Sequence, residues 1–330
     1  MVDWRSVEAA FQTLVSGTAS AEHEFRVAQV RRNTFVARSH AGHPSVFFEL
    51  AQIPEGMAIE AGGLVLRPFR SVVFRLGDRE WTAPTAMLSC TQPELSEGFL
   101  ILAAALIERL EQRSPILWVD VWALVDEWQA LLAQASTLLS AEDEQGLWGE
   151  LKLLAASTSR DRLAAGYVAG ESEDTDFDIG SLSIEVKTAR IPLRHHFSVK
   201  QTKPETGELQ RKRLVLSLHV QTDSAGGESV SEIAKRLLAS VSNPARLLQQ
   251  LLKRGFDPVS GRNPMRKFSL ASREYWFNSA DVPHVTKWDD GVLSIRYVAA
   301  LDQAKSLTGE RLRDVESALG VSFVSRESVA

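Results

Sequence analysis

Cysteine is almost absent from this chain of 330 residues, in which Cys90 is the single example. One cysteine excludes an intramolecular disulfide and a cysteine-based zinc cluster, so its simplest role is that of a small core residue. Long apolar runs are also missing, because the longest, Phe99 to Ile107, is too short to span a bilayer. We therefore expect a protein without a membrane segment.

An excess of positive charge is absent as well, because the formal net charge is -5. This balance argues against a partner bound along the whole surface, but it leaves room for a local basic groove. The segment Met1 to Leu14 carries charges and lacks the apolar stretch of a secretory signal. We accordingly expect a cytoplasmic protein.

The length allows two domains. Between residues 24 and 86, short alternating segments separated by turn residues predict strands, and hence a β-rich N-terminal domain over residues 1–115. Such a domain has no recognisable cofactor loop and would recognise DNA or dock a partner. Residues 116–330 mix helical and alternating patterns and predict a second, mixed α/β domain. Within it, residues 190–210 read as irregular and charged.

The second domain is organised around Asp174 to Lys187, which predicts two short strands joined by a turn at Gly180-Ser181. Glycine at the first turn position favours the mirror-image turns of hairpins. In this register Asp176 faces Glu185 on the polar side of the hairpin, and apolar residues occupy the other side. A longer turn would bring Asp178 into the place of Asp176.

Two carboxylates that face each other repel, which destabilises a hairpin unless a cation lies between them. Hard cations such as Mg²⁺ bind carboxylate oxygens, so Asp176 and Glu185 are candidate metal ligands. Lys187 projects to the same side, where its ammonium can orient or deprotonate a water beside the metal. The alternative is an amphipathic hairpin whose polar side simply faces solvent.

A helix preceding the hairpin begins after Ser140 and contains Gly146 and Gly149. Glycines inside a helix cost about 1 kcal/mol each relative to alanine, so they indicate that another element approaches closely. Glu150 follows on the flank of the apolar stripe. It is either a further acid of the site or a surface acid beside a tight contact between helix and sheet.

Basic residues are concentrated immediately after the hairpin, in a chain that is acidic overall. They are Lys187, Arg190, Arg194, Lys200, Lys203, Arg211, Lys212 and Arg213. Basic side chains beside a metal-binding acid pair suit a phosphodiester backbone, although a solvated loop is the simpler explanation of a charge run. His195 and His196 are unsuitable as a metal pair, because adjacent residues of a strand point in different directions.

These residues resemble the PD-(D/E)XK nuclease superfamily. The resemblance rests on Gly146 to Leu151, on Asp176-Phe177, on Ile184 to Thr188 and on the stretch from Phe277 to Leu301. The chain is most similar to bacterial PD-(D/E)XK motif proteins found near restriction and phage-defence genes. Thr175 stands where the proline that gives the motif its first letter would be, a departure shared by many members.

The resemblance implies an α+β fold, a restriction-endonuclease-like core in which helices flank a central mixed sheet. It also implies Mg²⁺, with Mn²⁺ as a substitute, held by Asp176 and Glu185 with Lys187 and Glu150 beside it. Gln201 matches a glutamine of several relatives and joins the DNA-binding candidates.

We expect a Mg²⁺-dependent DNA endonuclease of a restriction or anti-phage system, with DNA, a second copy of the chain and other defence proteins as its partners. Two alternatives stay open. One is a non-catalytic DNA-binding or assembly subunit with the same fold, and the other is a nuclease acting on RNA or nucleotides.

Overall fold

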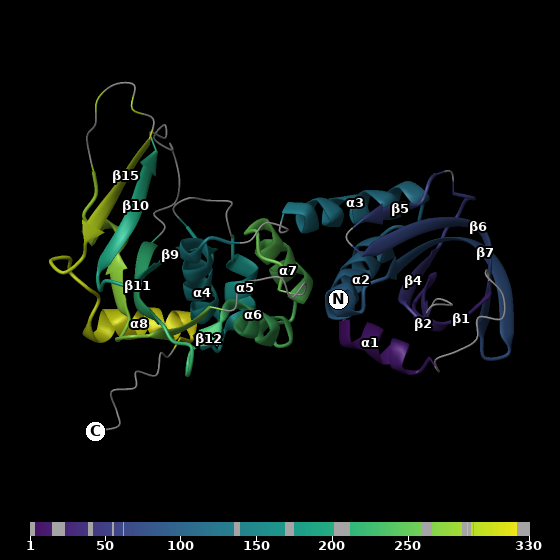
Figure 1. Cartoon of the computed structure of the whole chain (residues 1–330), viewed down its shortest axis with the longest axis horizontal. Coiled ribbons are helices and arrows are strands. Elements are labelled where there is room, and N and C mark those ends of the chain that lie inside the picture. Colours follow the sequence, from purple (N-terminus) through teal and green to yellow (C-terminus); the bar gives the residue numbers. More distant parts are fainter. Residues whose placement is uncertain are drawn as a thin grey trace. The chain divides into compact units, whose positions relative to one another are not determined.

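The computed structural model describes residues 4–14, 24–38, 42–54, 56–61, 63–134, 139–168, 175–200, 212–258, 266–285, 289, 292 and 294–321. The chain forms two compact units, the first spanning Met1–Ser136 and the second consisting of Thr137–Pro258 and Arg262–Ala330. Each unit contains helices and strands (Figure 1), so the predicted α+β class is confirmed.

The division between the units differs from the predicted boundary after residue 115. The helix α3 (Trp118–Gln134) packs against α2 (Ser96–Glu111) and therefore belongs to the first unit. From the sequence alone, the apolar residues of α3 are as compatible with the start of the second domain as with the end of the first. No helix among the described residues has the length and apolar character needed to cross a membrane.

The first unit is built on one curved sheet, in which the described strands follow the order β1-β6-β7-β4-β3-β2 and β5 pairs with β6. Its elements are α1 (Trp4–Gln12), β1 (Glu24–Arg26), β2 (Ala28–Arg31), β3 (Thr34–Arg38), β4 (Pro44–Glu49), β5 (Ile59–Ala61), β6 (Leu64–Leu76), β7 (Arg79–Cys90), the 3-10 turn Pro93–Leu95, α2 and α3. The predicted β-rich character of this region is confirmed.

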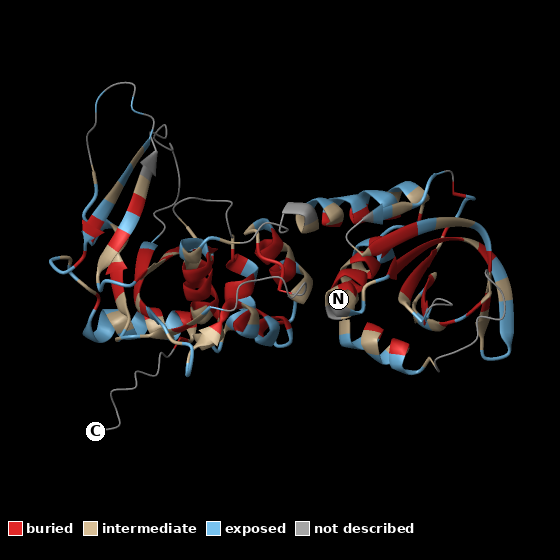
Figure 2. Cartoon of the chain, viewed as in Figure 1, coloured by how far each residue is buried: buried red, intermediate tan, exposed pale blue. Residues whose placement is uncertain are grey.

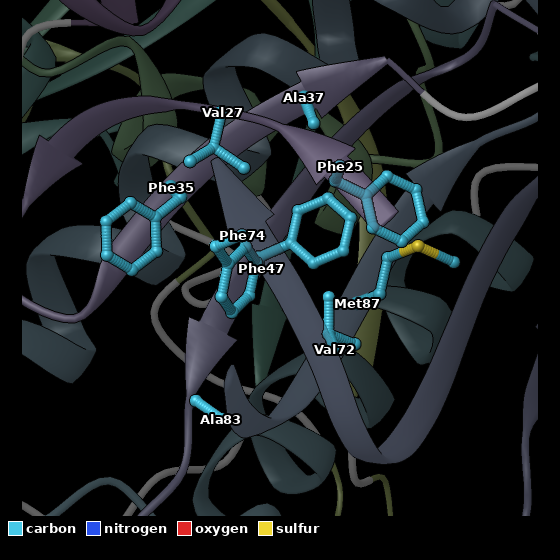
Figure 3. Packing of buried hydrophobic residues seen from close by; sticks show 9 residues of the cluster. All are labelled: Phe25, Val27, Phe35, Ala37, Phe47, Val72, Phe74, Ala83 and Met87. Atoms are coloured by element: carbon cyan, nitrogen blue, oxygen red, sulfur yellow. The ribbon is translucent and has the colours of Figure 1, made fainter. Parts of the chain in front are cut away.

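Aromatic side chains fill the concave side of this sheet. Figure 3 shows Phe25, Phe35, Phe47 and Phe74 gathered with smaller apolar residues. The Phe47 and Phe74 rings meet edge to face, with centroids 5.7 Å apart. Burial of such a side chain stabilises the fold by about 1.5–3 kcal/mol, so this cluster alone accounts for an independent core.

The second unit carries the hairpin. Its elements are α4 (Ala141–Ala156), α5 (Arg160–Gly166), β8 (Phe177–Asp178), β9 (Leu182–Ala189), β10 (Arg194–Lys200), β11 (Lys212–Thr222), β12 (Glu228–Ser229), α6 (Val230–Leu238), α7 (Pro244–Lys253), β13 (Lys267–Leu270), β14 (Tyr275–Asn278), the 3-10 turn Ser279–Asp281, β15 (Ser294–Ala300) and α8 (Gly309–Leu319). One sheet has the order β12-β13-β11-β9-β8, with β14 also pairing with β11, and a separate ribbon consists of β10 and β15.

The centre of this sheet is the parallel pair β9 and β11, and β8 lies at the edge. Parallel strands are usually covered on both faces, which explains why Ile184, Leu216 and Leu218 are fully buried. Helix α4 packs against β9 and α6, and Figure 2 shows that it is largely buried. Its N-cap is Ser140, whose side chain accepts from the Asp143 N–H, as the sequence predicted.

Two predictions for this unit were wrong in detail. The segment after residue 190 is not irregular throughout, because β10 pairs with β15 about a hundred residues later in the chain. A pairing partner so distant in the sequence cannot be predicted from the local pattern of residues. The sequence also predicts one strand over residues 268–278, but the structure divides it into β13 and β14, which pair with different parts of β11.

Glycine in α4 provides a matched test of the packing. A Cβ added at Gly149 would lie 2.3 Å from the Thr188 Cγ2 atom on β9, whereas a Cβ at Gly146 meets only the Arg254 Nη2 atom at 3.8 Å. We expect Gly149→Ala to lower the free energy of unfolding by about 1–3 kcal/mol, because the strand must shift. Gly146→Ala should raise it by about 0.5–1 kcal/mol through helix propensity.

Urea denaturation of the two variants beside the wild type measures both effects. Equal stability of the two variants would contradict the close approach of α4 to β9.

Candidate active site

The hairpin of β8 and β9 has the register that the sequence predicted. Phe177 pairs with Ile184 and Asp178 with Ser183, and the Ile179 N–H donates to the Leu182 carbonyl at 2.9 Å. Gly180 occupies the turn with φ 86°, a backbone conformation that glycine adopts without strain.

The acids and the lysine of this hairpin line one pocket of about 1080 Å³, formed within the second unit. Asp176, Glu185 and Lys187 all contribute to its wall, whereas Asp178 does not. The Asp176 Oδ2 atom accepts a hydrogen bond from the Val186 N–H at 2.6 Å. The Glu185 Oε1 atom lies 2.5 Å from the Lys187 Nζ atom. The register therefore brings both carboxylates and the ammonium to a common space.

Glu150 reaches the same pocket from α4, and its side chain is only 3% exposed. Both of its oxygens have protein donors: the Tyr167 hydroxyl donates to Oε2 at 2.6 Å, and the Arg254 guanidinium donates to Oε1 at 3.2 Å. Burial first, and the charge of Glu150 second, raise the pKa of Tyr167 well above its usual range. The phenol therefore stays protonated and acts as a permanent donor.

Asp176 is in an environment that disfavours its ionised form. Burial is the largest cause that raises its pKa well above the ordinary value, followed by the charge of Glu150, and Glu185 adds to the effect. The Val186 N–H and the Lys187 ammonium act in the opposite direction. At Asp176, burial and the neighbouring carboxylates thus outweigh the hydrogen bond and the ammonium.

A divalent cation fits this donor chemistry. Mg²⁺ prefers oxygen ligands, and it usually retains several waters beside one or two carboxylates. Asp176 and Glu185 are the motif carboxylates that would hold it, since both oxygens of Glu150 accept from Tyr167 and Arg254. Among the described residues there is no compact group of three or more histidine, cysteine or carboxylate side chains.

The predicted DNA-binding residues separate into three groups. Arg190 and Arg194 line the pocket, and each has a partner: the Arg190 Nε–H donates to the Gln145 amide oxygen at 3.2 Å, and Arg194 forms two bonds to Asp302. Lys212 and Arg213 are exposed at the start of β11 and do not line the pocket.

The remaining predicted DNA-binding residues are not placed in space. The segment with Gln201, Lys203 and Arg211 lies outside the described residues, as does the side chain of Lys200. Their contribution to DNA binding stays a prediction.

Other residues of the pocket were missed by the sequence analysis. Arg254 follows α7 and Arg296 belongs to β15, and Tyr167, which follows α5, touches the site through its hydrogen bond to Glu150. No local pattern marks them, since each reaches the site through tertiary packing. His196, which was considered only as half of a metal pair, also lines the pocket.

His195 alternates with His196 along β10, so it lies on the opposite face of that strand, and it is buried. Its Nε2 atom lies 2.7 Å from the Ser217 hydroxyl on β11. Burial first and the nearby Lys187 charge second lower the pKa of His195 to about 4. The Lys187 ammonium also lies 5.0 Å from the centroid of the Phe197 ring. The lysine is thus supported by neutral and aromatic groups, with Glu185 as its ion-pair partner.

Comparison with known proteins gives one match. A family model described as "Putative PD-(D/E)XK family member, (DUF4420)" matches residues 3–302. No curated protein and no solved structure gives a significant match.

Removing the charge of Asp176 should stabilise the metal-free protein. A carboxyl whose pKa is raised on folding destabilises the fold above its unfolded pKa, and the full cost is present above its folded pKa. We expect Asp176→Asn to raise the Tm of the second unit by about 2–4 °C for each kcal/mol relieved, measured in EDTA at about pH 8. Mg²⁺ should raise the Tm of the wild type and leave the variant unchanged.

A lower Tm of Asp176→Asn in EDTA would show that the hydrogen bond to Val186 outweighs the repulsion.

His195 should make stability depend on pH. Its pKa is depressed on folding, so the stability it contributes is present above the unfolded pKa of 6.5 and is lost as pH falls toward about 4. We expect the wild type to lose about 2 kcal/mol more than His195→Gln between about pH 7.5 and pH 5. Parallel pH profiles of the two proteins would contradict the buried neutral imidazole.

Proposed function

Since the chain belongs to the DUF4420 family of PD-(D/E)XK proteins, we propose that it is a Mg²⁺-dependent DNA endonuclease. The observation that supports this proposal is the convergence of Asp176, Glu185 and Lys187 on one pocket. These residues match the acids and lysine of the motif, and burial together with the nearby carboxylates raises the pKa of Asp176, as is common at functional sites.

Asp176 and Glu185 would hold the cation, with Mn²⁺ as a substitute for Mg²⁺. A bound ion of this kind polarises a phosphate oxygen and lowers the pKa of a coordinated water. The backbone N–H of Val186 fixes one Asp176 oxygen, which leaves the other for the ion.

Lys187 would orient the attacking water and offset charge on the scissile phosphate. Its ammonium is restrained by Glu185 at 2.5 Å and by the Phe197 ring, yet 23% of its side chain is exposed to the pocket. Because the ammonium is held in place and still exposed, it can contact a substrate without reorganising. Such preorganisation is the main source of electrostatic catalysis.

Glu150 would act as a positioning residue. Its carboxylate is shared between Tyr167 and Arg254 and does not face a substrate alone. Its charge nevertheless raises the pKa of Asp176 and so strengthens the demand of the site for a cation. Arg190 and Arg194 would bind the phosphates that flank the reacting one.

We place this activity in a restriction or anti-phage system in the cytoplasm, with the first unit recognising DNA or docking another protein of the system. Cleavage of both strands requires two active sites, which a homodimer supplies most simply. These assignments are proposals that follow from the resemblance of the motif.

A second candidate is a non-catalytic DNA-binding or assembly subunit. It is favoured by one observation: both oxygens of Glu150 are engaged by protein donors, and Glu185 is paired with Lys187, so protein groups already occupy two of the three candidate acids. A site of this composition can retain the fold and the phosphate contacts without cutting.

Plasmid cleavage with Mg²⁺ distinguishes the candidates. We expect the wild type to nick or linearise DNA, Lys187→Ala to lose about 10²–10³-fold in rate, and Lys235→Ala, an exposed lysine on α6, to retain full activity. RNA of the same sequence should be cut more slowly.

Undiminished cleavage by Lys187→Ala would remove this lysine from the mechanism. Calorimetry with Mg²⁺ or Mn²⁺ that shows no binding to the wild type would favour the non-catalytic subunit instead.

A further inference from the structure

The ribbon of β10 and β15 is the part of the second unit whose role the motif does not explain. Arg194 to Lys200 pair with Ala300 to Ser294 in antiparallel register, and Figure 1 shows the two strands side by side. Among the described residues neither strand pairs with a third one. The ribbon therefore has two faces and two unpaired edges.

The inner face anchors the ribbon to the unit. Phe197 and Ala299 are buried in a cluster with Val215 of β11 and Phe277 of β14. Tyr297 packs against the same cluster, and its ring stacks on Phe197 with centroids 5.9 Å apart. Because this face is fixed on the central sheet, the position of the outer face is fixed as well.

The outer face lines the same pocket as Asp176 and Glu185. Side chains alternate along a strand, so this face carries the residues that the inner face does not. Those that line the pocket are Arg194, His196 and Ser198 from β10, and Ser294, Arg296 and Val298 from β15. None of these side chains is acidic, which distinguishes the face from the acidic floor of the pocket.

Within this face the arginines have different surroundings. Arg194 is tied to Asp302 by two hydrogen bonds, which fixes its guanidinium at the base of the ribbon. Arg296 is exposed. Two residues later on the same face, Val298 is 57% exposed and is paired with His196 of β10. An exposed valine between basic groups offers an apolar contact in a row that is otherwise polar.

We propose that the β10–β15 ribbon enters the major groove of duplex DNA, where Arg296, His196 and Val298 contact base edges while Arg194 binds phosphate. This inference rests on the proposed DNA substrate of the pocket. The major groove is about 12 Å wide and admits a two-stranded ribbon. Seven residues per strand extend about 23 Å, enough to cross it beside the scissile phosphate.

A duplex suits the ribbon better than a single strand. Proteins that bind single strands stack the bases on aromatic side chains. The aromatic residues of this ribbon, Phe197 and Tyr297, lie on the inner face within the core cluster. The outer face instead presents a guanidinium, an imidazole and an apolar group, which match the guanine edge and the thymine methyl group.

Fluorescence anisotropy with a labelled duplex tests the proposal, in Ca²⁺ so that cleavage does not interfere. We expect Arg296→Ala to weaken binding about tenfold. Arg313→Ala, which removes an exposed arginine of α8 outside the pocket, should stay within about twofold of the wild type. Thermal melting of both variants confirms that they are folded.

A duplex in which 7-deazapurines replace the purines locates the contact, because it lacks the N7 acceptors of the major groove. The wild type should bind it several-fold more weakly than the normal duplex, and Arg296→Ala should not distinguish the two. Equal binding of Arg296→Ala and Arg313→Ala, tighter binding of a single strand or of RNA, or indifference of the wild type to 7-deazapurines would each overturn the groove assignment.

These outcomes are separable from those of the cleavage experiment. Weakened duplex binding by Arg296→Ala in a protein that never cleaves DNA would support the ribbon and reject the nuclease. If the protein cleaves DNA and Arg296→Ala leaves duplex binding unchanged, the nuclease is supported and the ribbon assignment is rejected.

Discussion

Burial of carboxylates near one another in a single pocket is the constraint on which the rest of the second unit depends. Glu150, Asp176 and Glu185 all line this pocket, where Arg254 is paired with Glu150 and Lys187 with Glu185. A pocket of this kind destabilises the fold unless positive charge is supplied. Proteins retain a destabilising pocket of this kind where their function requires it.

The surrounding fold holds these groups at fixed positions. The parallel pair β9 and β11 is covered by α4, which approaches β9 closely because Gly149 has no side chain. A strand confined in this way cannot slip, since a shift of one residue would send Glu185 and Lys187 to the other face. The tight contact of helix and sheet thus positions the acid pair and the lysine together.

Much of this centre could be predicted from the sequence, because the information is local. Gly180 sets the turn, the turn sets the pairing of Phe177 with Ile184, and Asp176 and Glu185 line the same pocket. What could not be predicted depends on residues distant in the chain. Arg254, which follows α7, donates a hydrogen bond to Glu150. The strand β10 pairs with β15 about a hundred residues later, so part of the basic segment that was predicted to be irregular is a strand.

The most direct test of the central claim is a crystal structure of the protein with Mn²⁺, measured at a wavelength where the metal scatters anomalously. The account predicts one anomalous peak within coordination distance, about 2.0–2.3 Å, of both the Asp176 and Glu185 oxygens. An empty pocket at saturating Mn²⁺, with the two carboxylates turned away from each other, would contradict it.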